Sequence, residues 1–141
     1  MLFRSIATGT GLGPFLSMLR SRQAFERAER VILVHGTRGV AELAHRPELE
    51  ALVSERGAGF RYLPVLSRQP ETEFLHGRVT QTLASGELEQ RAETPIAAET
   101  AHVMLCGNPS MIDEVLALLA ARGLRRHRQR TPGHVTTEKY W

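Results

Sequence analysis

Four short apolar runs, separated by helical segments, constrain the fold of this 141-residue chain most strongly. We predict a buried strand in each of them: Leu2–Ala7, Val31–His35, Tyr62–Leu66 and His102–Cys106. None of the runs alternates cleanly between polar and apolar residues, which is typical of parallel strands that are covered on both faces. Because the strands alternate with helices along the chain, the sequence predicts a parallel sheet with helices on both sides.

The weaker signals complete this predicted architecture. A fifth, more polar strand is predicted over His134–Trp141. Pro64 either argues against the third strand or places that strand near an edge of the sheet. The best-marked helix has Asn108 as its cap and Gly123 after its end. The helical segments are Pro14–Arg22, Glu48–Glu55, Arg78–Ala84 and Pro109–Arg122. We therefore predict one α/β domain over residues 1–141: a Rossmann-like, three-layer, doubly wound and mostly parallel five-stranded sheet.

Composition narrows the class of protein without choosing a function. The chain is 42% hydrophobic and 23% charged, which suits a globular fold rather than a disordered tail. No apolar run is long enough to span a bilayer, so we expect no membrane partner. A single cysteine, Cys106, allows no internal disulfide and fits a reducing compartment, which we take to be the cytoplasm.

The glycine-rich stretch ATGTGLGPF lies between the first predicted strand and the first predicted helix. In open α/β sheets, ligands bind beyond the carboxyl ends of the strands. Glycines at positions 9, 11 and 13 let the backbone turn without side chains, and Thr8 and Thr10 add hydroxyl donors. Because the helix start offers N–H groups and carries no acid in its first turn, an outside anion fits there. The motif is not G-x-G-x-x-G, and a plain glycine turn is the alternative interpretation.

Three arginines follow the ends of successive predicted elements. Arg38 comes directly after the second strand, where a domain that prefers NAD would place an acidic residue. A guanidinium favours a phosphate at that position and therefore NADP(H) over NAD(H). Arg68 and Arg78 occupy comparable places, so all three could meet one 2′-phosphate. Taken singly, each is better explained as a solvated surface arginine, and only the three together favour the phosphate-binding interpretation.

The segment LCGNPSM, residues 105–111, repeats the pattern of a strand that ends in glycine before a proline-started helix. Cys106 would lie at the tip of the strand, and Gly107 would let a ligand approach. An inert, buried thiol is the alternative interpretation of Cys106.

Together these segments resemble one family. ATGTGLGPFLSMLR, LVHGTR, VLSRQ, GRVT, LCGNPSMID and the tail RRHRQRTPGHVTTEKYW resemble the NADP(H)-binding domain of bacterial ferredoxin/flavodoxin–NADP reductases, in the order expected along nearly the whole chain. The resemblance implies electron transfer between NADPH and ferredoxin or flavodoxin through a bound FAD.

The resemblance also implies roles for individual residues. Those expected to hold the pyrophosphate and the nicotinamide side are Thr8, Gly9, Thr10 and Gly11, and those expected to hold the 2′-phosphate are Arg38, Ser67, Arg68 and Arg78. Thr37, Asn108 and Met111 complete the predicted nucleotide-binding set. Cys106 and Gly107 are expected to flank the nicotinamide. Tyr140 and Trp141 are expected to cover part of the FAD, unless they form an aromatic strand end packed on its own domain. The predicted catalytic residues are Cys106 and Trp141, and no metal site is expected.

The chain also departs from that family. A FAD-binding β-barrel domain is expected upstream of Met1, so we expect little or no turnover from this chain alone. Arg4 and Ser5 would lie in the central strand, where the family has apolar residues, and we predict that the first five residues are not native. A nucleotide-binding module without redox activity is the alternative function.

The basic run LRRHRQR, residues 124–130, has two interpretations: a solvated basic face, or a docking patch for an acidic ferredoxin or flavodoxin. It contains no interleaved aromatic residue and no nucleic-acid recognition motif, so we do not expect a nucleic-acid partner.

Overall fold

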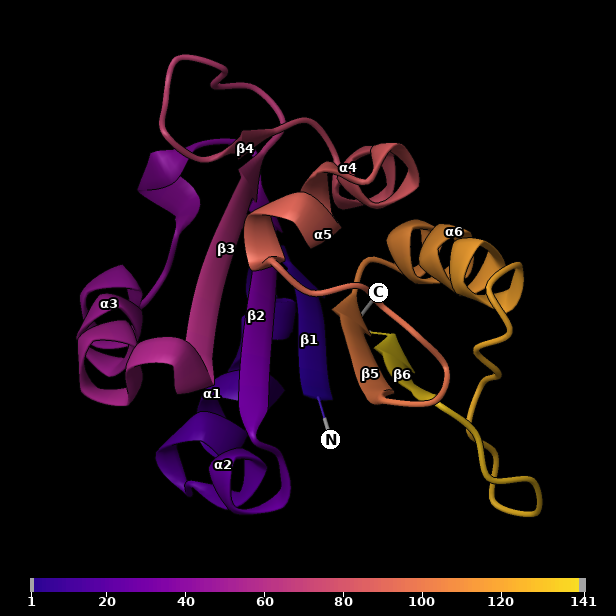
Figure 1. Ribbon diagram of the computed structural model, residues 1–141. Helices are drawn as coiled ribbons and strands as arrows, with labels where there is room; N and C mark the ends of the chain where they lie inside the picture. The colour runs from indigo at the N-terminus through magenta and orange to yellow at the C-terminus, as the bar shows by residue number, and fades with distance from the viewer. Residues whose placement is uncertain (1, 140–141) are drawn as a thin grey trace.

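A computed structural model describes residues 2–139, and the side chains of these residues apart from those at 2–4 and 10. Its centre is a six-stranded sheet in the order β4-β3-β2-β1-β5-β6, in which every neighbouring pair is parallel (Figure 1). The strands are β1 (Leu2–Thr8), β2 (Arg30–Thr37), β3 (Phe60–Leu66), β4 (Leu75–His76), β5 (Ala101–Gly107) and β6 (Val135–Lys139). The predicted fold class is confirmed, with one strand more than expected.

Helices cover both faces of this sheet. The helices α1 (Gly13–Arg20), α2 (Gln23–Arg27) and α3 (Arg46–Arg56) pack on one face, and α4 (Val79–Ser85), α5 (Glu87–Ala92) and α6 (Pro109–Ala120) pack on the other (Figure 1). Three short 3-10 turns, η1 (Gly9–Leu12), η2 (Val40–Glu42) and η3 (Gly57–Gly59), join the elements. The three layers follow directly from strands that bury both of their faces.

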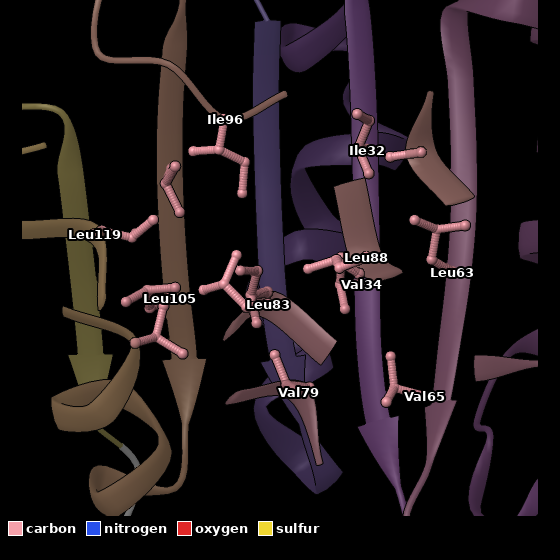
Figure 2. Close-up of a cluster of buried hydrophobic side chains, with 14 of the residues drawn as sticks. Ile32, Val34, Leu63, Val65, Val79, Leu83, Leu88, Ile96, Leu105 and Leu119 are labelled. Atoms are coloured by element: carbon pink, nitrogen blue, oxygen red, sulfur yellow. The ribbon is translucent and has the colours of Figure 1, made fainter. Parts of the chain in front are cut away.

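Alternation along each strand divides the core into two clusters. In β2, Val31 and Leu33 pack against α1–α3, whereas Ile32 and Val34 face α4–α6. Figure 2 shows the second cluster, in which side chains from α4 and α5 lie against the sheet face that carries Ile32, Val34 and Leu105. Since Val31 to Val34 bury apolar side chains on both faces in turn, no polar alternation is visible in this part of the sequence.

Pro64 lies where β3 has a free side. The short β4 pairs only with the last two residues of β3, through Val65–Leu75 and Leu66–His76. At Pro64, β3 pairs only with β2, opposite His35, so the missing N–H of proline removes no bond to β4. The expectation of a strand near the edge is confirmed.

The order of the strands fixes where a ligand can bind. The chain builds outward from β1 through β2 and β3 to β4, then returns to place β5 on the other side of β1. In parallel sheets such a reversal leaves a crevice beyond the carboxyl ends of the strands. Among residues 2–139, no helix has the length and apolarity needed to cross a bilayer.

Ser5 is buried in β1, which is an uncommon place for a polar side chain. The side chain of Arg4 is outside the described atoms. The expectation that the first five residues are not native stays a prediction.

Candidate functional site

A cleft of about 830 Å³ opens at the carboxyl edge of the sheet. Its walls come from the ends of β1, β2, β3 and β4 and from the first turns of α4 and α6. This volume lies within the range of pockets that bind small organic ligands and cofactors. Of the predicted nucleotide-binding residues, it is lined by Thr8, Gly9, Thr37, Arg38, Ser67, Arg68, Arg78, Asn108 and Met111.

Backbone hydrogen bonds hold the first two arginines side by side. The N–H of Ser67 donates to the carbonyl of Thr37, and the N–H of Arg68 donates to the carbonyl of Arg38, each over 2.9 Å. These bonds extend the β2–β3 ladder one step beyond the strands. Arg38 and Arg68 are therefore neighbours across two adjacent strand ends, and both are exposed to the cleft.

The third arginine follows β4 in the same way. The N–H of Gly77 donates to the carbonyl of Leu66 over 2.9 Å, which brings the next residue, Arg78, to the same edge. Arg78 is exposed and precedes α4, where its own N–H donates to Oε1 of Gln81 over 2.8 Å. Three guanidinium-bearing residues thus follow three consecutive strands and line one wall of the cleft.

A carboxylate lies within this basic wall. Nε of Arg38 lies 2.9 Å from Oε1 of Glu42, so the two side chains form an ion pair, and Glu42 also lines the cleft. The turn η2 brings Glu42 back toward the residue that follows β2. Sequence reasoning missed this pair, because the spacing of four residues predicts an ion pair only on an α-helix, and here a 3-10 turn joins the two residues.

The glycine-rich segment forms the floor of the cleft near β1. It begins with the 3-10 turn η1, in which Gly9 has a φ of 51° and is exposed. No described side chain caps η1, and neither η1 nor α1 carries an acid in its first turn. The N–H groups at the start of η1 therefore suit a bound anion.

His35 supports this segment from below. It is buried in β2, and its Nε2 donates to the carbonyl of Gly9 over 2.9 Å. The carbonyl can only accept, so Nε2 carries the proton, and the buried Nδ1 has no partner among the described atoms. Burial lowers the pKa of His35 and outweighs the opposing effect of the hydrogen bond to Gly9. A neutral imidazole therefore fixes the position of the segment.

The segment after β5 closes the cleft against β1. The N–H of Asn108 donates to Oγ1 of Thr8 over 3.0 Å, while Oδ1 of Asn108 accepts from the N–H groups of Ser110 and Met111 over 2.8 and 3.4 Å. The predicted cap of the Pro109 helix is confirmed. Gly107 has a φ of 128°, and a Cβ there would lie 2.9 Å from the carbonyl oxygen of Thr8. Only glycine fits this close approach.

The remaining predicted residues do not line the cleft or are not described. Gly11, Cys106 and Gly107 are buried beneath the floor. Burial of Cys106 is compatible with the alternative of an inert thiol. The side chain of Thr10 is not described, and the predicted roles of Tyr140 and Trp141 fall outside the described residues.

The basic run of residues 124–130 lies away from the cleft. It precedes β6, and all strands are parallel, so it lies toward the amino ends of the strands (Figure 1). Its four arginines are exposed. This position gives the run no part in the cleft, and it does not distinguish a solvated face from a docking patch.

Fold and cleft together define a Rossmann-like α/β domain with a ligand site at the carboxyl edge of its sheet. Residues 6–116 match the family described as the oxidoreductase NAD-binding domain, and the chain belongs to that family.

Similar proteins narrow this further. The flavodoxin/ferredoxin–NADP reductase of Escherichia coli (strain K12) is 39% identical over 137 residues, and the ferredoxin–NADP reductase of Pseudomonas aeruginosa is 36% identical over 143 residues. These matches cover 96% and 95% of this chain, and 55% of each reductase. A crystal structure of a ferredoxin NADP⁺ reductase from Neisseria gonorrhoeae with bound FAD and NADP superimposes with a TM-score of 0.91 at 31% identity, covering 99% of this chain and 56% of that one.

The resemblance found in the sequence is thereby confirmed, and the chain spans about half the length of the relatives that it matches.

Proposed function

We propose that this chain binds NADP(H) as the nucleotide-binding part of a flavin-dependent ferredoxin or flavodoxin–NADP⁺ reductase. The observation that carries the proposal is the row of arginines at positions 38, 68 and 78, which follow three consecutive strands and line one cleft. Guanidinium groups match phosphate in charge and in hydrogen-bond geometry.

The extent of the cleft supports a dinucleotide rather than a mononucleotide. Its arginine wall lies beyond β2–β4, whereas Thr8 and Asn108 lie at the reversal between β1 and β5. A ligand that uses both parts must extend across three strand ends. In this proposal the arginines and Ser67 hold the 2′-phosphate, Thr37 and Met111 contribute to the nucleotide-binding surface, and the backbone of η1 with Thr8 holds the pyrophosphate.

The same arrangement directs the nicotinamide toward the end of β5. Asn108 lines the cleft there, above Cys106 and Gly107. In the whole reductase, a bound FAD would supply the hydride acceptor and the one-electron steps toward ferredoxin or flavodoxin. The task of this chain is then to orient the nucleotide, with Tyr140 and Trp141 as the proposed contacts to the flavin.

The test compares two nucleotides that differ only in the 2′-phosphate. Arg38→Ala and Arg68→Ala each remove a charge-assisted contact worth about 1.5–3 kcal/mol. We expect the affinity for NADP⁺, measured by calorimetry, to fall about ten- to a hundredfold, with little change for NAD⁺. Arg20→Ala is the matched control, because Arg20 is also exposed but pairs with Glu48 on α3, outside the cleft. Equal losses for both nucleotides would contradict the assignment.

A second assay separates the reductase from a nucleotide-binding protein without redox activity. We propose that the chain alone oxidises NADPH slowly or not at all, and that it gains this activity when a FAD-binding domain of the family is joined upstream. Binding without activity in the joined protein would favour the second candidate. The cytoplasmic location and the ferredoxin or flavodoxin partner are parts of the same proposal.

A further inference from the structure

Two acidic residues line the cleft, Glu42 and Glu114, and Glu42 forms an ion pair with the basic wall. Oε1 of Glu42 lies 2.9 Å from Nε of Arg38, and the side chains are 42% and 64% exposed. Both residues line the cleft. A carboxylate is therefore fixed beside one of the three groups assigned to the 2′-phosphate.

Two opposite effects act at this position. A 2′-phosphate carries a charge of about −1.5 to −2 near pH 7, so a neighbouring carboxylate repels it and neutralises part of the attraction to Arg38. A ribose that has a free 2′-hydroxyl instead finds in that carboxylate a hydrogen-bond acceptor, as in domains that prefer NAD. The repulsion weakens binding of the nucleotide that carries a 2′-phosphate. The hydrogen bond strengthens binding of the nucleotide that has a free 2′-hydroxyl.

We propose that Glu42 is a specificity-determining residue that limits the preference of this cleft for NADP(H) over NAD(H). The inference rests on the proposed function, because it assumes that Arg38 faces the adenosine ribose. The arginines make the cleft bind NADP(H) more tightly than NAD(H), and Glu42 reduces the difference between the two affinities.

The ion pair between Glu42 and Arg38 also suggests the opposite role, in which Glu42 holds the guanidinium in its binding orientation. The two roles predict changes of opposite sign. If Glu42 acts by charge on the ligand, its neutralisation raises the preference for the 2′-phosphate. If Glu42 acts by orienting Arg38, its neutralisation lowers that preference.

The experiment uses the full chain and the substitution Glu42→Gln, which keeps the size of the side chain and removes its charge. The probes are adenosine 2′,5′-bisphosphate and 5′-AMP. The readout is the preference for the bisphosphate, which is the dissociation constant of 5′-AMP divided by that of the bisphosphate, both measured by calorimetry. Glu50→Gln is the matched control, because Glu50 pairs with Arg46 over 2.7 Å at the same i,i+4 spacing but outside the cleft.

We expect the Glu42→Gln variant to raise the preference for the bisphosphate about threefold or more at low salt, the size expected for an exposed charge pair. The gain should shrink at ionic strengths well above about 0.15 M, because salt screens exposed charges. The Glu50→Gln variant should leave the ratio unchanged.

This inference alone would be overturned if the unsubstituted chain prefers the bisphosphate and the Glu42→Gln variant shows an equal or smaller preference for it. If the unsubstituted chain does not prefer the bisphosphate over 5′-AMP, the proposed function fails first, and the inference fails with it.

Discussion

Among the glycines of the glycine-rich segment, Gly11 is the position at which an added side chain should destabilise the fold most. A Cβ at this position would lie 2.6 Å from the carbonyl oxygen of Cys106 and 2.8 Å from Cα of Gly107. These atoms belong to the backbone of β5, which is paired with β1 on one side and β6 on the other at Cys106. The backbone cannot move aside as a flexible side chain would, so Gly11→Ala must displace the loop or separate the strands.

The expected magnitude follows from this rigidity. Overpacking of a well-packed interior costs about 1–3 kcal/mol, and contact with backbone that is held on both sides places Gly11→Ala near the upper end, at about 3 kcal/mol. For a domain of this size, that corresponds to a fall in melting temperature of roughly 10 °C. Because Gly9 of the same loop lines the cleft, the affinity for NADP⁺ should fall as well.

Gly13, two residues later, provides the matched control. A Cβ at Gly13 would meet nothing within 4 Å, and its backbone angles of −49° and −54° are helical. Gly13→Ala should therefore stabilise the protein by about 0.4–1 kcal/mol, because alanine restricts the unfolded chain. Urea denaturation followed by circular dichroism measures both variants. Changes of the same sign and size in the two variants would refute the packing argument.

Substitutions at two further positions, His35 and Asn108, test the supports of the cleft. Burial holds the pKa of His35 below 6.5, so below pH 6.5 the unfolded chain binds a proton that the folded chain excludes, and the free energy of unfolding falls as the pH falls. His35→Gln can still donate to Gly9 but does not titrate, so urea denaturation between pH 5 and 7 should show a shallower loss; an unchanged slope would count against this role of His35. Asn108→Ala removes the cap of α6 and should cost about 1 kcal/mol, whereas Asn108→Asp keeps the acceptor for Ser110 and Met111 and should cost less. Equal losses in the two variants would contradict the capping role.

The sequence predicted those parts of the site that depend on strand ends. Arg38 and Arg68 each follow an apolar run, and parallel strands bring their carboxyl ends to one edge, so their proximity needed no tertiary information. The pairing of Glu42 with Arg38 depends instead on a short turn that reverses the chain. Neither hydrophobic periodicity nor composition reports such a turn.

The glycine-rich segment also shows that local sequence signals do not report tertiary surroundings. Gly9, Gly11 and Gly13 share one predicted purpose, a turn without side chains, but each has a different environment in the structure. Gly9 has a positive φ, Gly11 has no room for a side chain, and Gly13 has open space around it. Which of these applies depends on where β5 lies, and β5 is about ninety residues further along the chain.

Several elements were missed because they are too short to carry a pattern. The two residues of β4 cannot show alternation, and the five and six residues of α2 and α5 cover fewer than two helical turns. His35 was assigned to a strand, but its hydrogen bond to Gly9 depends on the position of η1 above β2.

The order of the strands along the chain also sets an order of assembly. The arginine wall is built by β2, β3 and β4, which follow one another, so it needs only short loop closures. The opposite wall needs the bond between Thr8 and Asn108, which are 100 residues apart. We therefore expect the half that carries the arginine wall to form early during synthesis on the ribosome. The cleft then becomes complete only when β5 pairs with β1. Nucleotide present during refolding should therefore promote this late step more than the early formation of the arginine wall.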